Sequence, residues 1–282
     1  FCKHKYYNNN KEYDMSVLKM GVVGAGFVGG SVINGFMTEH CGVAVVDPKH
    51  NTYTLGQLAD SKPSLIFICV PTPESDTGEV DVSIARSVLK DLHDLTYEGI
   101  VVIKSTITAD HLQSFVEDYN LRIVYNPEFL TEANAFHDFC NPPMQILGGD
   151  WHDCEEVERA YLQHSRVKVV PTFKTDITTA SMLKYAINSY LATKVIFMNE
   201  LHTMLEASGA EASWEQFTDM LSRDVRIGNS HLQVPGPDLK FGFGGHCFPK
   251  DTAALHHYAS SLGVDLSVLR QAMQTNRKVR DD

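Results

Sequence analysis

Several features that would place this protein in other classes are missing from its sequence. The longest apolar runs, such as Leu65–Val70, are far too short to cross a bilayer. Lys and Arg number 24 against 35 Asp and Glu, and the formal net charge of −11 argues against nucleic acid and membranes as partners. An anionic substrate would therefore need its own local basic pocket.

Cysteines are few, and none of the six belongs to a CxxC pair or stands with histidines at metal-ligand spacing. We therefore expect neither a metal site nor a disulfide framework, and a cytoplasmic location. Residues 1–14 are polar and lack the apolar segment of a signal peptide. They are expected to form a disordered leader.

Short β-branched runs alternate with amphipathic stretches through the first 170 residues. The expected strands are Met20–Val23, Val43–Asp47, Leu65–Val70, Ile100–Ile103, Ile123–Tyr125, Gln145–Leu147 and Val167–Val170. Such alternation is typical of a parallel, doubly wound sheet. The predicted fold class is therefore α/β, with a Rossmann-type domain over residues 15–172.

The pattern becomes helical after Pro171. Asp176–Ser208 carries apolar residues at helical spacing, has no internal Gly or Pro and ends at Gly209, which predicts one long helix. Three more helices are expected, at Ser213–Leu221, Pro249–Leu262 and Leu266–Val279. The second domain, residues 173–282, is thus predicted to be helical.

A G-x-G-x-x-G turn links the first expected strand to a helix, and its residues are Gly24, Ala25, Gly26, Phe27, Val28 and Gly29. Alone this motif is weak, and a Gly-rich turn without a ligand is an equal alternative. Here Asp47 ends the next strand about 20 residues on, as the dinucleotide fingerprint requires. We predict that the helix N-terminus binds the diphosphate of NAD. Asp47 would hold the ribose and repel the 2′-phosphate of NADP.

Two further segments are unusual for structure alone. The segment 126–132, NPEFLTE, follows a strand end, where doubly wound sheets bind their ligands. The segment 242–251, GFGGHCFPKD, is a Gly-rich loop that leads into a helix, with Pro249 suited to its first position. Cys247 precedes that helix and Asp251 follows one turn later, so the helix dipole and nearby lysines favour a thiolate. A buried, inert cysteine is the alternative.

Lys184 and Asn188 lie four residues apart on the long helix and share a face. Alone they would be a solvated lysine and an ordinary asparagine. Together with the other motifs, however, they resemble the UDP-glucose/GDP-mannose dehydrogenase family. The resemblance spans about Lys19 to Asp282 and includes GAGFVG, the segment 67–73, Lys104-Ser105-Thr106, NPEFLTE, Arg226-Ile227-Gly228 and GFGGHCFPKD.

The resemblance implies a four-electron oxidation of a nucleotide sugar, most closely UDP-glucose to UDP-glucuronate with two NAD, in polysaccharide biosynthesis. Cys247 would capture the aldehyde as a thiohemiacetal, and its oxidation would give a thioester that water releases as the acid. The other catalytic residues implied are Lys184 and Asn188 at the oxyanion, Asp251 and Glu128 in water and proton handling, and Thr106 near the nicotinamide.

The resemblance also implies the binding residues. The cofactor would be held by Gly24, Gly26, Phe27, Val28, Gly29, Asp47, Val70, Pro71, Thr72, Thr106, Glu132 and Lys250. The substrate would be held by Glu128, Phe129, Leu130, Lys184, Asn188, Arg226, His231, Lys240, Phe241 and Gly244. In the family Arg226 reaches the substrate of a neighbouring subunit, so a homodimer is expected.

Familiar family members carry a third α/β domain that contacts the nucleotide base, whereas this sequence stops at Asp282. A fragment or a short form is therefore expected, and the nucleotide and sugar stay open, with GDP-mannose and UDP-N-acetylhexosamine as alternatives. A two-electron hydroxyacid-type dehydrogenase would have no use for the GFGGHC cysteine. A non-catalytic NAD-binding dimerisation module would not need Glu128, Lys184, Cys247 and Asp251 together.

Overall fold

The computed structural model describes residues 18–50, 53–75, 77–131 and 133–280. It also gives the backbone of two short paired strands, β1 (Tyr7–Asn8) and β2 (Lys11–Glu12). The rest of the expected leader, residues 1–14, lies outside the described residues. The chain divides into a sheet unit, Phe1–Pro73 with Asp81–Lys184, and a helical unit, Glu74–Val80 with Tyr185–Asp282. The expected domains 15–172 and 173–282 stay a prediction.

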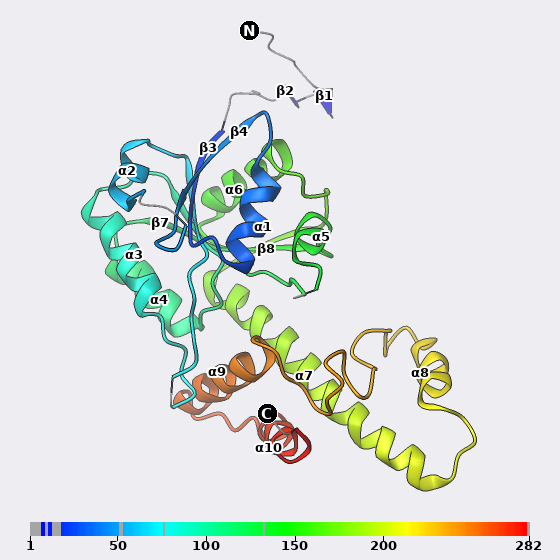
Figure 1. Cartoon of the computed structure of the whole chain (residues 1–282). Coiled ribbons are helices and arrows are strands. Elements are labelled where there is room, and N and C mark those ends of the chain that lie inside the picture. The colour runs from blue at the N-terminus through cyan, green and yellow to red at the C-terminus, as the bar shows by residue number, and fades with distance from the viewer. Residues whose placement is uncertain are drawn as a thin grey trace. The chain divides into compact units, whose positions relative to one another are not determined.

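The main sheet of the sheet unit contains seven strands in the order β4-β3-β5-β6-β7-β8-β9 (Figure 1). They are β3 (Leu18–Val23), β4 (Cys41–Val46), β5 (Leu65–Ile68), β6 (Ile100–Ile103), β7 (Arg122–Tyr125), β8 (Gln145–Gly149) and β9 (Thr172–Thr175). Neighbours are parallel except β7 and β8, which pair antiparallel. The chain reverses its direction across the sheet at β3, so β3 and β5 flank the topological switch point.

Helices cover both faces of this sheet, which confirms the α/β, doubly wound class. Figure 1 shows α2 (Leu55–Asp60), α3 (Ser83–Asp94) and α4 (Ala109–Asp118) on one side, and α1 (Phe27–Phe36), α5 (Ala135–Cys140) and α6 (Trp151–His164) on the other. Every residue of β5 and β6 is buried, as expected of strands covered on both faces. Tyr161 of α6 packs against Phe36 and Phe67, with ring centroids 5.0 and 6.1 Å away.

The seventh strand was predicted in the wrong place. Val167–Val170 forms no strand, and the pairing partner of β8 is Thr172–Thr175 instead. The backbone of the predicted segment is used elsewhere, because the N–H of Lys168 donates to the carbonyl of Cys140 at 2.9 Å. The β-branched valines therefore belong to an extended segment that pairs with no strand. Val169 in this segment is 82% exposed.

The helical unit follows the predicted pattern closely. Its helices are α7 (Ile177–Ser208), of which the first eight residues belong to the sheet unit, α8 (Trp214–Ser222), α9 (Phe248–Ser261) and α10 (Ser267–Val279). The long helix α7 ends before Gly209, whose φ of +73° lies in the left-handed region. Ser213 starts α8 through a capping box with Gln216.

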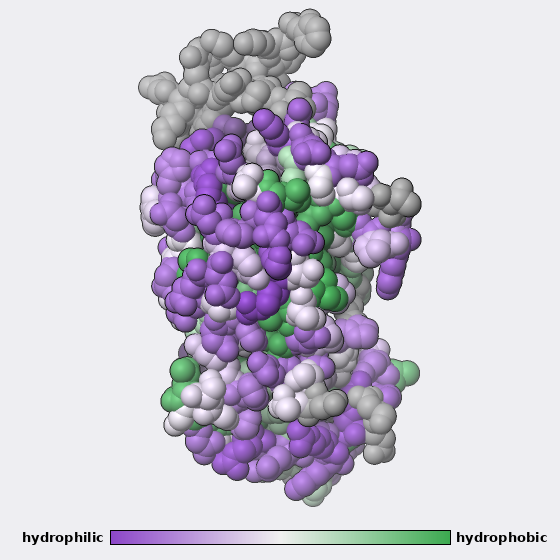
Figure 2. Space-filling model, turned by 90° about the vertical axis from the view of Figure 1, so that its left-hand side faces the viewer, coloured by the Kyte–Doolittle hydropathy of each residue, from purple (hydrophilic) through white to green (hydrophobic). Residues whose placement is uncertain are grey.

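The surface in view in Figure 2 is mainly hydrophilic. On the face that Figure 2 shows, hydrophilic residues cover most of the described surface and hydrophobic residues occupy smaller areas. Among the described residues, no helix combines the length and the apolar character that a membrane span requires.

Candidate active site

The Gly-rich turn lies at the switch point of the sheet. Gly24 has a φ of +90°, and a Cβ atom added there would lie 2.6 Å from the carbonyl oxygen of Cys69, just after β5. A Cβ atom on Gly29 would lie 1.8 Å from the carbonyl oxygen of Gly24. Any side chain at these two positions would push the turn away from β5 or open it, so glycine is required at both.

The N-terminus of α1 fits the diphosphate of a dinucleotide. Gly26 is the N-cap residue, and no side chain caps the first turn of the helix. A Cβ atom on Gly26 would meet no atom within 4 Å, so the space beside this N-terminus is open. Exposed N–H groups and the positive end of the helix dipole therefore face room for a phosphate. Phe27, the first residue of the helix, is 43% exposed.

Asp47 follows β4 and bonds to the same turn. Its Oδ2 accepts a hydrogen bond from the N–H of Ala25 at 2.7 Å, and its Oδ1 accepts one from the N–H of Lys49 at 2.8 Å. These two bonds lower the pKa of Asp47 below its ordinary value, so its carboxylate is charged. Besides the role predicted at the ribose, Asp47 thus braces the Gly-rich turn, which its spacing in the sequence did not indicate.

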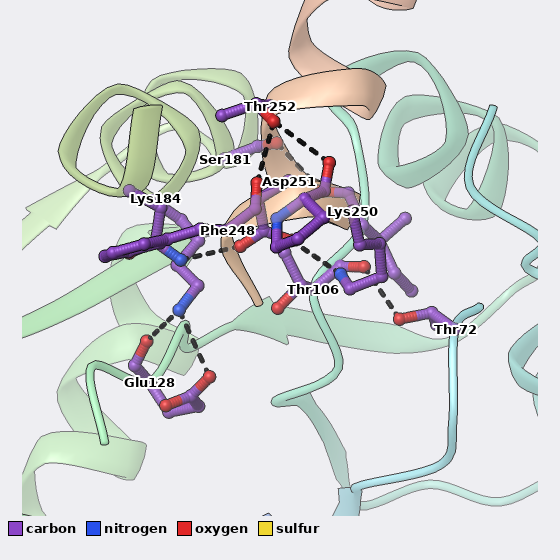
Figure 3. A network of polar contacts seen from close by, with 12 residues as sticks. Thr72, Thr106, Glu128, Ser181, Lys184, Phe248, Lys250, Asp251 and Thr252 are labelled. Atoms are coloured by element: carbon purple, nitrogen blue, oxygen red, sulfur yellow. Dashed lines mark hydrogen bonds and ion pairs between the residues drawn. The ribbon is translucent and has the colours of Figure 1, made fainter. Parts of the chain in front are cut away.

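The segments after β5 and β6 are tied to each other beside this turn. The hydroxyl of Ser105 donates to the carbonyl of Val70 at 2.7 Å. The hydroxyl of Thr72 donates to the carbonyl of Thr106 at 3.0 Å (Figure 3). The structure therefore brings together three of the predicted cofactor residues at the carboxyl ends of adjacent strands. The predicted cofactor residue Glu132 lies outside the described residues.

Glu128 and Lys184 form a buried pair in the sheet unit. The Nζ of Lys184 donates to the backbone carbonyl of Glu128 at 2.6 Å and lies 3.1 Å from its Oε1 (Figure 3). Only 2% of Lys184 and 9% of Glu128 are exposed. Lys184 thus binds both the backbone carbonyl and the carboxylate of Glu128. The conformation of the loop after β7 therefore depends on this lysine.

The loop that carries Glu128 adds two further contacts. The N–H of Leu130 donates to Oε2 of Glu128 at 2.6 Å, and the Nζ of Lys184 lies 5.1 Å from the ring centroid of Phe129. Burial alone would raise the pKa of Glu128, but Lys184, the Leu130 N–H and Lys104 outweigh it and hold this pKa below its ordinary value. Glu128 is therefore an ionised carboxylate at neutral pH.

In the helical unit, Cys247 is the N-cap residue of α9. Phe248 and Pro249 are the first two residues of the helix, so Pro249 stands one place later than predicted. The N–H of Asp251 donates to the carbonyl of Cys247 at 2.8 Å, which closes the first turn. A cysteine at this end of a helix meets the positive end of the helix dipole.

Asp251 is 1% exposed and accepts a hydrogen bond at each oxygen. The amide of Asn188 donates to Oδ2 at 2.6 Å, and the Nζ of Lys250 lies 2.6 Å from Oδ1 (Figure 3). Three predicted residues from two separate motifs, Asn188 on α7 and Lys250 with Asp251 on α9, are thus in contact. Thr252 beside them bonds its hydroxyl to the carbonyls of the preceding turn, at 2.7 Å to Phe248.

The Gly-rich loop before Cys247 is held by two asparagines that sequence reasoning missed. The N–H of Gly242 donates to Oδ1 of Asn199 on α7 at 2.9 Å. The amide of Asn276 on α10 bonds both the N–H and the carbonyl of Phe243, at 2.8 and 3.0 Å. A Cβ atom on Gly244 would lie 2.0 Å from the guanidinium of Arg280, so this glycine leaves room for the residue that follows α10. A single sequence contains no pattern that marks an asparagine as bound to a distant loop, so these two residues were not predicted.

Arg226 lies apart in an exposed loop after α8. Its guanidinium forms a two-point ion pair with Asp224 of the same loop, Nε to Oδ1 at 2.9 Å and Nη2 to Oδ2 at 2.6 Å. The buried Lys194 of α7 donates to the carbonyls of Ile227 at 2.9 Å and Ser230 at 2.6 Å, and so fixes this loop. Sequence reasoning missed Lys194 as well.

The remaining predicted substrate residues follow that loop. The ring centroid of His231 lies 5.5 Å from that of Phe248 in α9, and burial together with Lys194 lowers the pKa of His231. The carbonyl of Lys240 accepts a hydrogen bond from the N–H of Gly236 at 2.8 Å. Phe241 is 42% exposed.

One group of potential metal ligands occurs among the described residues, at His152, Asp153 and Glu156 of α6. Arg122 bonds both carboxylates, with its Nε 2.9 Å from Asp153 and its Nη2 2.8 Å from Glu156. A guanidinium therefore already neutralises these acids.

Two family models match the sequence. The NAD binding domain of the UDP-glucose/GDP-mannose dehydrogenase family matches residues 52–165, and the central domain of the same family matches residues 178–278. The chain belongs to the UDP-glucose/GDP-mannose dehydrogenase family. The cofactor of this family's first domain is NAD, which agrees with the open helix N-terminus at Gly26.

Individual proteins that are similar to this chain belong to the same family. UDP-glucose 6-dehydrogenase TuaD of Bacillus subtilis (strain 168) is 35% identical over 225 residues, which are 77% of this chain and 47% of that protein. The chain spans about half the length of such curated relatives. A UDP-glucose dehydrogenase from Pyrobaculum islandicum superposes with a TM-score of 0.81 at 21% identity, over 97% of this chain and 70% of that one.

The fold alone does not choose among reactions. A 3-hydroxyisobutyrate dehydrogenase from Mycobacterium tuberculosis superposes with a TM-score of 0.72 at 16% identity, over 93% of both chains. The reaction must therefore be inferred from the side chains of the site.

Proposed function

We propose that this protein oxidises a nucleotide sugar, UDP-glucose, to the corresponding carboxylate with two NAD per sugar. The observation that carries the proposal is Cys247 at the N-cap of α9, one turn before the buried Asp251. A dehydrogenase that transfers a single hydride has no use for a nucleophile at this place. The 35% identity to a UDP-glucose 6-dehydrogenase supports the choice of UDP-glucose over other nucleotide sugars.

NAD supplies one function in the proposed reaction, the acceptance of a hydride from carbon, and it does so twice. After the first oxidation, the sulfur of Cys247 adds to the aldehyde carbon, and the C–S bond keeps this reactive group from escaping. Lys184 and Asn188 donate hydrogen bonds to the oxygen that gains charge in this adduct. The second oxidation converts the adduct to a thioester of Cys247.

Hydrolysis then releases the acid. Water adds to the thioester carbon, its proton passes to the carboxylate of Glu128, the C–S bond breaks, and the sulfur of Cys247 leaves as thiolate. An ionised Glu128 is needed as the acceptor, and its lowered pKa supports this role. Asp251 serves as a second acid–base group, while Thr106 helps to place the water.

Binding roles are part of the same proposal. Gly24, Gly26, Gly29 and Asp47 hold NAD, with the segments at Val70–Thr72 and Thr106 beside them. We further propose that the protein is a homodimer in which Arg226 binds the sugar nucleotide of the partner, and that it works in the cytoplasm in polysaccharide synthesis. The exposure of Arg226, with 85% of its side chain accessible, supports the first of these points.

The direct test counts NADH. Purified protein would be incubated with NAD and, separately, with UDP-glucose, UDP-N-acetylmannosamine, GDP-mannose and 3-hydroxyisobutyrate, and NADH and acid would be measured. Two NADH per UDP-glucuronate formed is the expected result. One NADH with free aldehyde would reject the four-electron reaction, and oxidation of 3-hydroxyisobutyrate alone would assign the two-electron alternative. NAD binding without turnover of any substrate would indicate a non-catalytic module.

A further inference from the structure

Lys104, the residue just after β6, is a buried cation to which the proposed reaction gives no role. Only 3% of it is exposed. Its Nζ donates to Oδ1 of Asn126 at 2.9 Å and lies 6.0 Å from the ring centroid of Phe139. Neither neighbour is charged, and among the described residues no carboxylate lies within ion-pair distance of Lys104. An apolar side chain would fill this place at lower cost, because burying an ammonium without a direct counter-ion is unfavourable.

Asn126 connects Lys104 to the loop that carries Glu128. This asparagine is fully buried, and its Oδ1 also accepts a hydrogen bond from the hydroxyl of Tyr161 at 2.7 Å. Its amide nitrogen donates to the carbonyl of Ile146 at 2.8 Å and to Oε1 of Gln145 at 3.2 Å. All the hydrogen-bonding capacity of the side chain is thus used, which leaves it one orientation. Glu128 follows only two residues later.

The ionisable groups around Lys104 come from four elements. Cys69 follows β5, Glu128 follows β7, Tyr161 lies on α6 and Lys184 on α7. Burial raises the pKa of Cys69 to about 12 and that of Tyr161 well above its ordinary value, so both are neutral. Burial lowers the pKa of Lys104 to about 8, with Glu128 opposing this shift. At neutral pH Lys104 therefore adds a positive charge to a site that holds the ionised carboxylate of Glu128.

We propose that Lys104 is a positioning residue for Glu128, which holds the loop after β7 through Asn126 and faces the carboxylate with a second positive charge. Lys184 binds Glu128 directly, whereas Lys104 binds the same loop at Asn126. The consequence for catalysis rests on the proposed function, in which Glu128 accepts a proton during release of the acid. Without Lys104, Glu128 would protonate at higher pH. The loop that carries Glu128 would also lose the hydrogen bond that Lys104 donates to Asn126, so the carboxylate would be held less well for proton transfer.

The first experiment needs no enzymatic activity. The titration of Glu128 would be followed by carbon-13 NMR of protein with labelled glutamate side chains, and its signal would be identified by its loss in Glu128→Gln. In Lys104→Met the midpoint should rise by about half a pH unit or more, because a nearby positive charge favours the carboxylate. Lys104→Arg should keep most of the wild-type value.

Lys194→Met is the matched control, because Lys194 is 8% exposed and donates to backbone carbonyls of the helical unit. It removes a buried ammonium elsewhere and should leave the Glu128 midpoint unchanged. If Lys104→Met does not fold, Lys104→Gln replaces it, since an amide keeps a hydrogen bond to Asn126. An unchanged midpoint in a folded, charge-free variant would overturn the proposal.

The second experiment addresses the reaction. If UDP-glucose is turned over, Lys104→Met should slow release of the acid several-fold more than it slows the first NADH formed in a burst. The acidic limb of the pH profile of kcat should move to higher pH, with KM little changed. Equal slowing of both steps without movement of the profile would refute positioning of Glu128. If the wild-type protein produces no acid, the proposed function fails, while the NMR titration still decides the role of Lys104.

Discussion

Cys247 is the residue on which the proposed reaction depends most directly. Its backbone ends the Gly-rich loop and starts α9, and its carbonyl accepts the N–H of Asp251. Serine has nearly the same size and can keep these backbone contacts. The consequences of removing the sulfur are therefore chemical.

We predict that Cys247→Ser lowers production of the acid by about 100-fold or more and leaves the affinity for NAD within about twofold. A serine hydroxyl is a much poorer nucleophile than a thiolate, whereas the Gly-rich turn that is proposed to bind NAD belongs to the sheet unit. NADH formation and NAD binding by calorimetry measure the two effects. Full production of acid by this variant would exclude Cys247 from the mechanism.

Asp47 binds the backbone of the Gly-rich turn and is proposed to select NAD over NADP. Its carboxylate accepts two backbone hydrogen bonds and is ionised, so a 2′-phosphate would meet like charge there. We predict that the wild-type protein prefers NAD over NADP and that Asp47→Ala narrows the ratio of kcat/KM values by about tenfold. Asp60→Ala, at the exposed end of α2, is the control and should keep the wild-type ratio. Equal use of both cofactors by the wild type would refute the assignment of Asp47.

Among the helices, α1 offers a comparison of two glycines in one element. Gly35 is buried against α5, and a Cβ atom there would lie 2.1 Å from the ring of Phe139. At Gly30 the nearest atom to an added Cβ is 3.9 Å away. The packing of α1 on α5 therefore requires glycine at only one of these positions.

We predict that Gly35→Ala destabilises the fold by about 1–3 kcal/mol, because α1 and α5 must separate. Gly30→Ala should be neutral or stabilise by up to about 1 kcal/mol, since alanine favours the helix and meets no obstacle. Urea unfolding of both variants without NAD measures the difference. A stable Gly35→Ala variant would show that α5 moves freely relative to α1.

At the scale of the whole molecule, exposed apolar side chains of α7 are candidates for the contact between the two subunits of the expected dimer. Leu183, Tyr190, Phe197 and Met204 are 37, 64, 55 and 68% exposed and stand seven residues apart. A seven-residue repeat places apolar side chains along one line of a helix, which is the pattern of a helix–helix seam. A second copy of the chain is the partner that the homodimer proposal supplies.

We predict that the protein is a dimer in light scattering and that Phe197→Glu shifts it toward monomer, because a charge would be buried in the seam. Glu200→Ala, an exposed change on the same helix, should leave the dimer intact. A wild-type monomer at micromolar concentration, with full activity, would contradict this prediction.

Complementation tests the shared site. An equal mixture of Arg226→Ala and Cys247→Ser subunits, after exchange, should recover about a quarter of the wild-type activity, because half of the dimers regain one intact site. Absence of recovery under conditions that exchange the subunits would show that each chain uses its own Arg226.

The local sequence determined many of the helices, strands and turns of this protein. The buried runs of β5 and β6, the G-x-G-x-x-G turn and the unbroken apolar pattern of α7 each predicted their element, because burial and backbone geometry restrict the residues that fit. The chemical types at positions 128, 184, 247 and 251 indicated a covalent oxidation through their resemblance to a family. Val167–Val170 was predicted as a strand because β-branched residues favour any extended chain.

Tertiary structure decided which partners these side chains meet. Lys104 and Asn126 are 22 residues apart, and Asn199 and Asn276 lie on different helices, yet each contacts a loop of the candidate site. A single sequence contains no periodic signal for such pairs, since a hydrogen bond between distant residues depends on the packing of whole elements. The sequence therefore indicated the groups that are proposed to react, and only the fold revealed the buried cation near Glu128, because burial is what changes the ionisation of a lysine.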